Sequence, residues 1–174
     1  MTSMNPERRR HLALSLGLLA TMPVASLGLA GCSRRESAPD VTYTLLNGAT
    51  DTLKAQQGKV VLVNFWATSC TTCVKEMPEI VATHEKFKAR GYNTVAVAMS
   101  YDPPAYVASF AETRKLPFGV AIDNTGAVAQ AFGDVRLTPT TFLLDKRGGI
   151  VKKYVGAPDF AALHGLIEEL LNTA

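Results

Sequence analysis

Residues 64–73 read NFWATSCTTC, a stretch that follows an apolar run and precedes a segment with helical periodicity. Its two cysteines, Cys70 and Cys73, stand three positions apart, where the expected strand ends and the expected helix begins. A pair with this spacing can be half of a metal site, a structural disulfide or a reactive dithiol, and the redox compartment of the chain bears on the choice. The N-terminus predicts that compartment.

The first 31 residues have the layout of a secretory signal. Three arginines at positions 8–10 are followed by residues 12–30, none of which is charged, as in the n-region and h-region of such signals. A transmembrane helix is the competing interpretation, but Pro23, two glycines and several small residues make this stretch a poor permanent span. It ends in LAGC at residues 29–32, which resembles the bacterial lipobox, so we expect lipidation of Cys32. Plain secretion and an unlipidated anchor stay open as alternatives.

The sequence predicts three parts: a lipoprotein signal peptide over residues 1–31, a polar tether over 32–40 and a single domain over 41–174. Of the 18 basic and 15 acidic residues, three basic and one acidic fall in the signal, which leaves 15 basic and 14 acidic residues. This near-neutral balance argues against nucleic-acid binding, which requires a basic face.

The expected domain alternates apolar runs with segments of helical periodicity. Strands are expected over 60–66, 94–99, 120–122, 141–144 and 150–155. Helices are expected over 74–90, 102–115, 126–132 and 158–171. Pro78 is expected to kink the first of these helices. This order of elements predicts an α/β fold with a mixed central sheet flanked by helices.

A zinc site and a structural disulfide are both weak interpretations of the cysteine pair. Structural zinc needs four ligands. The other cysteine, Cys32, is expected to carry the lipid. The two remaining candidate ligands, His84 and His164, are far apart in sequence and are expected on helix surfaces. The stabilisation from a disulfide grows with the loop that it closes, and this loop is very short.

A reactive dithiol is therefore the favoured interpretation. Cys70 is expected at a helix N-terminus, where unpaired N–H groups and the helix dipole stabilise a thiolate. Cys73, one helical turn further on, is placed to attack a mixed disulfide on Cys70 and release the product. We expect Cys70 to be the attacking thiol and Cys73 the resolving thiol.

With these residues the chain resembles the thioredoxin superfamily. Residues 63–67 (VNFWA) precede the CxxC pair, and residues 138–140 (TPT) follow some 65 positions later, as do the two site motifs of that superfamily. The resemblance implies a thioredoxin fold in which Pro139 is cis and lies against the active-site disulfide. It further implies that a substrate binds across Trp66, Thr138 and Pro139.

Within the superfamily, the chain is more similar to the TlpA/ResA-like branch of membrane-attached oxidoreductases. Residues 73–78 (CVKEMP) resemble the branch's CxxE-x-P continuation, and residues 139–145 (PTTFLLD) resemble its PTTFLID stretch. Residues 103–122 match the helix and strand that this branch inserts between the CxxC and the cis-proline. The resemblance covers residues 41–172.

Three residues depart from the patterns of the superfamily. Ser69 and Thr72 stand where tryptophan and proline are frequent, so the reduction potential does not follow from the motif. Asn64 takes the place of thioredoxin's buried aspartate, which removes that proton acceptor. Glu76, three residues beyond Cys73, is the substitute that the branch suggests. The alternative for Glu76 is an ordinary exposed helix carboxylate.

The resemblance implies an extracytoplasmic thiol:disulfide oxidoreductase that reduces protein disulfides through Cys70 and Cys73, with Glu76 as the third candidate catalytic residue. Its partners would be client proteins with disulfides, a membrane thiol transporter as electron donor and the lipid membrane through Cys32. No cofactor or metal is expected, because the dithiol is the redox group. The expected location is the periplasmic side of a bacterial membrane, with inner and outer membrane both open.

A peroxiredoxin-like thiol peroxidase is one alternative, since peroxiredoxins share the fold. Their peroxidatic cysteine follows a Pro-x-x-x-Thr/Ser-x-x-Cys motif. Neither Cys70 nor Cys73 is preceded by proline and Thr/Ser at those positions. This absence disfavours the peroxidase.

A copper-binding or copper-delivery module is the other alternative, because thiolates are soft ligands that suit Cu(I). Such a site would need a third ligand close to the cysteines. The candidates are Met77 and Met99.

Overall fold

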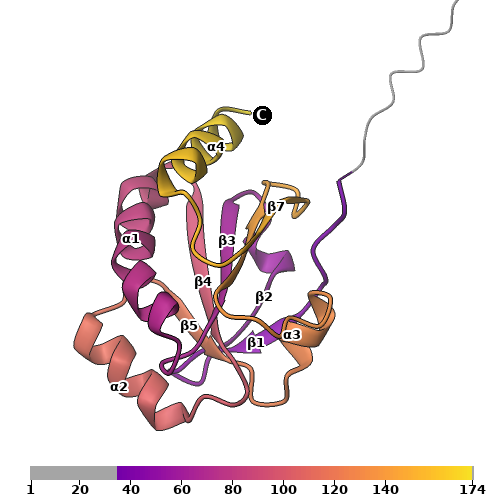
Figure 1. Cartoon of the computed structure of the whole chain (residues 1–174). Coiled ribbons are helices and arrows are strands. Elements are labelled where there is room, and N and C mark those ends of the chain that lie inside the picture. Colours follow the sequence, from indigo (N-terminus) through magenta and orange to yellow (C-terminus); the bar gives the residue numbers. More distant parts are fainter. Residues whose placement is uncertain (1–34, 174) are drawn as a thin grey trace, which may run out of the picture. The chain divides into compact units, whose positions relative to one another are not determined.

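The computed structural model describes residues 35–173, which build a central sheet with elements packed on both of its faces (Figure 1). The strands of this sheet are β3 Val60–Trp66, β4 Tyr92–Ala98, β5 Gly119–Ile122, β6 Thr140–Leu144 and β7 Ile150–Val155. They lie in the order β5-β4-β3-β6-β7. β3, β4 and β5 are parallel, whereas β6 runs antiparallel to β3 and β7 antiparallel to β6. The expected mixed sheet is confirmed.

Four α-helices accompany the sheet in the described residues. They are α1 Thr71–Phe87, α2 Pro104–Arg114, α3 Ala127–Ala131 and α4 Phe160–Asn172. α1 continues through Pro78 as one helix and is followed by a short 3-10 turn that ends at Gly91. α2 and β5 form the expected insertion between the cysteine pair and Pro139. The result is the predicted thioredoxin fold.

The central strand β3 separates two apolar cores because successive side chains of a strand point to opposite faces. Leu62 and Trp66 belong to the core under α1, α2 and α4. Val63 and Phe65 belong to the core on the opposite face, with residues of α3. All seven residues of β3 are buried. Asn64 has the same parity as Leu62 and Trp66, so its amide points towards α1.

Two short strands escaped prediction: β1 Thr42–Thr44 and β2 Thr50–Thr52, which pair antiparallel beside the sheet. Tyr43 is the single buried residue of β1. Three residues with one buried side chain are too few to show a period of two in the sequence.

The first described residues pack along the turn between β6 and β7. The N–H of Ala38 donates to the carbonyl of Gly148 at 2.8 Å, and the Arg35 guanidinium pairs with the Asp145 carboxylate at 3.1 Å. From Arg35 onward, the expected tether is therefore fixed to the domain.

The expected signal peptide over residues 1–31 and the expected lipidation site Cys32 lie outside the described residues. Within residues 35–173, no helix is both long enough and apolar enough to cross a membrane.

Candidate functional site

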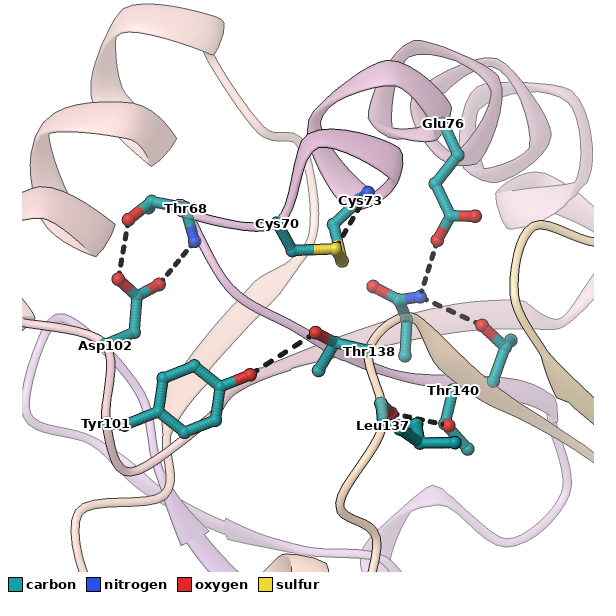
Figure 2. The surroundings of a disulfide bond; sticks show 11 residues. Thr68, Cys70, Cys73, Glu76, Tyr101, Asp102, Leu137, Thr138 and Thr140 are labelled. Atoms are coloured by element: carbon teal, nitrogen blue, oxygen red, sulfur yellow. Dashed lines mark hydrogen bonds between the residues drawn. A yellow bond between two sulfur atoms is a disulfide. The ribbon is translucent and has the colours of Figure 1, made fainter.

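Cys70 and Cys73 lie where the chain leaves β3 and enters α1 (Figure 2). A turn with a hydrogen bond from the Cys70 N–H to the Ala67 carbonyl, 3.1 Å, connects the two elements. Cys70 is the N-cap of α1, and its Sγ accepts a hydrogen bond from the N–H of Cys73 at 3.1 Å. A Ser or Asp oxygen usually fills this capping position. After reduction, the helix dipole at this end favours the thiolate of Cys70.

The two sulfurs form a disulfide but differ in access. Cys70 is half-buried, whereas Cys73 is fully buried and packs in the core with Met77. A thiol or disulfide arriving from solvent can therefore reach the sulfur of Cys70 and not that of Cys73. This asymmetry fits an attacking thiol at Cys70 and a resolving thiol at Cys73.

The segment before β6 lies beside the cysteine pair. Thr140 pairs with Phe65, which places Pro139 level with the end of β3. The Thr138–Pro139 peptide bond is cis, as expected. The Pro139 carbonyl accepts a hydrogen bond from the N–H of Gly156 at 2.8 Å, which fixes the segment against the end of β7. Figure 2 shows Thr138 close to the disulfide.

Glu76 lies one turn beyond Cys73 on α1 and is only 4% exposed. It is therefore not the exposed helix carboxylate of the alternative interpretation. Its Oε1 accepts a hydrogen bond from the Asn64 amide at 3.1 Å, and the same amide nitrogen donates to Thr141 Oγ1 at 2.9 Å. Burial raises the pKa of Glu76 to about 7, against a smaller lowering by the Asn64 hydrogen bond. The carboxyl group can thus exchange a proton near neutral pH.

Trp66, expected in the substrate groove, is fully buried. Its ring packs against Phe110 of α2, with the ring centroids 5.1 Å apart, because β3 turns residue 66 towards the helices. The side chain offers no surface to a client. Its place is under the cysteine-bearing turn, so the expectation of direct substrate contact is corrected.

Two residues of the loop between β4 and α2 belong to the site and were missed by sequence reasoning. Asp102 was expected to open a helix, but α2 has no side-chain cap and the Asp102 carboxylate contacts Thr68 instead. The Tyr101 hydroxyl lies 3.3 Å from Thr138 Oγ1. These partners are 34 and 37 residues apart in sequence, and no local pattern connects them.

Comparisons with known proteins agree with this geometry. The family described as Redoxin matches residues 34–167. The thiol-disulfide oxidoreductase ResA of Bacillus thuringiensis is 36% identical over 121 residues, which are 70% of this chain and 69% of that protein. ResA of Halalkalibacterium halodurans is 31% identical over 163 residues, 86% of this chain and 89% of that protein. A thiol:disulfide interchange protein of the thioredoxin family from Chlorobium tepidum superposes with a TM-score of 0.73 and 25% identity, covering 80% of this chain and 99% of its own.

The chain belongs to the redoxin family and is ResA-like. This ResA-like redoxin is a thiol:disulfide oxidoreductase of the thioredoxin superfamily. Its disulfide at the start of α1 is the only disulfide in residues 35–173, and no other cysteine falls in that part of the chain.

In residues 35–173, no three His, Cys, Asp or Glu side chains gather in a way that could hold a metal ion. Of the two methionines considered as a third copper ligand, Met77 packs in the same core as Cys73. Met99 belongs to the core on the opposite sheet face from Cys73, so it is no third copper ligand.

His84, expected on a helix surface, is buried at 5% exposure. Its ring lies edge-on to Phe118, with centroids 5.3 Å apart, because α1 turns this position towards the sheet. His164 contacts Thr83 at 2.8 Å.

Proposed function

We propose that this redoxin is an extracytoplasmic, lipid-anchored enzyme that reduces the disulfides of client proteins, with Cys70 as the attacking thiol and Cys73 as the resolving thiol. The observation that carries the proposal is the asymmetry of the pair. The Cys70 sulfur is accessible and accepts the Cys73 N–H at the N-cap of α1, whereas Cys73 is completely buried.

The reaction needs no further redox group. The Cys70 thiolate attacks one sulfur of a client disulfide, a mixed disulfide forms, and the other client sulfur leaves as a thiolate that takes up a proton. The Cys73 thiol then loses its proton and attacks Cys70 Sγ. The second client thiolate leaves and is protonated in turn. The client gains two electrons and two protons, and the Cys70–Cys73 disulfide forms.

Glu76 is proposed as the proton partner of the resolving step. It follows Cys73 by one turn of α1, and positions three apart on a helix are neighbours. Its pKa of about 7 lets it accept the Cys73 proton near neutral pH. Asn64, its hydrogen-bond donor, holds the carboxylate in place.

Client polypeptide is proposed to lie across Thr138 and Pro139. Thr138 is half-buried and Leu137, the residue before it, is 65% exposed, so the segment presents surface beside Cys70. Trp66 is proposed to support the site indirectly, because it belongs to the buried core against which Cys70 and Cys73 pack.

The location and the electron donor are proposed from the N-terminal sequence. The uncharged run and the LAGC ending at Cys32 support attachment to a bacterial membrane through lipid, with the domain on its periplasmic side. An oxidised dithiol on that side has to be reduced again before the next client. A membrane thiol transporter is the proposed donor.

The proposal is tested by trapping. Full-length Cys73→Ser, reduced and mixed with a protein that contains a disulfide, is expected to accumulate a mixed disulfide, because the resolving thiol is absent. Cys70→Ser is the matched control and is expected to form none, since Cys73 is buried. Trapping by Cys70→Ser and not by Cys73→Ser would overturn the assignment of roles. A parent protein that reduces no disulfide substrate would overturn the proposed function.

A further inference from the structure

The loop between β4 and α2 contacts both segments that frame the cysteine pair (Figure 2). Asp102 bonds to Thr68, which lies two residues before Cys70. The neighbouring Tyr101 reaches Thr138 of the segment before β6. The Tyr101 contact is exposed to solvent, whereas the Asp102 contact is partly buried and is therefore the stronger constraint on the site.

Asp102 is 2% exposed, and both of its carboxylate oxygens accept hydrogen bonds from one residue. The N–H of Thr68 donates to Oδ2 at 2.6 Å, and the Thr68 hydroxyl donates to Oδ1 at 2.5 Å. No Lys, Arg or His forms an ion pair with Asp102 in residues 35–173. A buried carboxylate is costly unless it is hydrogen-bonded, and such charge-assisted bonds are short and strong. Thr68 is therefore held firmly.

Thr68 stands between the end of β3 and the N-cap of α1. The residue before it, Ala67, is fully buried and accepts the N–H of Cys70 at 3.1 Å. Fixing Thr68 thus fixes the direction in which the chain arrives at Cys70. That direction decides whether Cys70 Sγ can meet the Cys73 N–H at the helix start.

We propose that Asp102 is a positioning residue for Cys70: through Thr68 it holds the Cys70 sulfur in the N-cap geometry that stabilises the thiolate. This inference rests on the proposed role of Cys70 as the attacking thiol. Without these hydrogen bonds, the turn loosens and the sulfur spends less time at the helix N-terminus. The pKa of the Cys70 thiol in the reduced protein then rises, and disulfide exchange slows.

The test compares variants of the full-length chain by the pH dependence of Cys70 alkylation and by the rate of reduction of a protein disulfide. Asp102→Asn keeps the shape but replaces one of the two acceptor oxygens by an NH2 group, which only donates, and Thr68→Val removes the hydroxyl donor alone. We expect Thr68→Val, which keeps the Asp102 charge, to raise the Cys70 pKa. We expect both variants to slow exchange, by up to about 10²-fold for Asp102→Asn, the loss that a displacement of 1 Å can cause. Thr68→Ser retains both donors and should restore the values of the parent.

Asp123→Ala is the matched control. Asp123 is 3% exposed and accepts the N–H groups of Val128 and Ala129 at 3.1 and 2.8 Å, so it is a buried two-bond carboxylate like Asp102. It caps α3 and does not contact the turn before Cys70. We expect its loss to lower the thermal midpoint while leaving the Cys70 pKa unchanged.

A parent-like Cys70 pKa in folded Thr68→Val, together with parent-like exchange rates in both variants, overturns the positioning role, even if their thermal midpoints fall. A thermal effect equal to that of Asp123→Ala, without a change in pKa or rate, does the same. Failure of the proposed function is a separate result, because it shows as exchange by the parent that does not depend on Cys70. The double variant Asp102→Asn/Thr68→Val is expected to be no slower than the slower single variant, since one contact is removed in both.

Discussion

The Asn64 amide nitrogen donates a hydrogen bond to the Glu76 carboxylate at 3.1 Å, inside the core beneath the cysteine pair. Asn64 is fully buried and Glu76 nearly so. The second carboxylate oxygen of Glu76 has no hydrogen-bond partner within the described residues. Burial of an incompletely paired carboxylate disfavours its charge, which explains a pKa raised to about 7. The Asn64 amide does not titrate, so Glu76 is the member of this pair that can bind and release a proton.

Replacing Glu76 by glutamine is expected to lower the apparent pKa of the nearby thiols and to slow disulfide exchange. Above pH 7, the ionised carboxylate repels a thiolate one turn away, and glutamine removes this repulsion. Exchange slows because the proton acceptor is lost, by about 10²-fold for a general base. Thiolate absorbance against pH and exchange rates measure both effects.

Glu79→Gln is the control for this substitution, because Glu79 is an exposed carboxylate on the same helix. It should leave the titration and the rate unchanged. Superimposable thiol titrations and equal rates for parent and Glu76→Gln would remove Glu76 from the site.

The same carboxyl group makes folding stability depend on pH. Its pKa is 4.5 in the unfolded reference and about 7 in the folded protein, so its contribution is complete below pH 4.5 and is lost as the pH rises through 7. A shift of this size corresponds to roughly 3 kcal/mol. Between pH 5 and 8, the parent should therefore lose more stability than Glu76→Gln. Urea unfolding at both pH values measures this, and parallel losses would show that the group ionises as freely in the fold as outside it.

His84 acts in the opposite direction. Burial lowers its pKa below the ordinary 6.5, so the folded protein resists the proton that the unfolded chain accepts. The stability that depends on neutral His84 is present above pH 6.5 and is lost as the pH falls below it. His84→Gln should reduce the loss of stability between pH 7 and 5, although His164, shifted the same way, retains part of it. Thermal midpoints of parent and variant at pH 7 and pH 5 measure this loss. An equal fall of the midpoint in both proteins would contradict a contribution from neutral His84.

The sequence was sufficient for the framework of the site. The apolar run of β3, the cysteines after it and the threonine–proline pair before β6 predicted the strand, the helix and the segment that meet there. The strand and the helix follow from local signals, because hydrophobic period and turn chemistry are properties of neighbouring residues. The place of the threonine–proline segment was implied by the resemblance to the thioredoxin superfamily.

The features of the site that could not be predicted depend on contacts between residues that are far apart in the sequence. Asp102 next to two prolines looked like a helix start, and only the fold shows that its carboxylate is turned to Thr68. The burial of Trp66 could have been read from the continuous apolar run of β3, and the face on which it lies from the parity that it shares with Leu62. The burial of His84 was not predicted, because the exposure of a helical residue depends on how its helix packs in the fold as well as on its neighbours along the helix.

The proposed lipid anchor at Cys32 is tested by fractionation. Full-length protein should be found with membranes, because the two or three acyl chains of a lipoprotein give stable attachment where a single chain does not. Cys32→Ala should release the protein or leave it unprocessed. Processed Cys32→Ala that stays with the membrane would contradict a lipid anchor, and a retained apolar segment would point to a transmembrane one.

The central claim, that the Cys70–Cys73 pair reduces protein disulfides, is tested most directly by its reduction potential. The full-length chain is equilibrated with defined ratios of reduced and oxidised thiol, and the fraction of the Cys70–Cys73 disulfide is measured. A reductant of client disulfides should have a reduction potential of about −270 mV, the value of thioredoxin. A reduction potential of about −120 mV, the value of the oxidant DsbA, would contradict this claim, because the pair would then oxidise the thiols of its clients to disulfides.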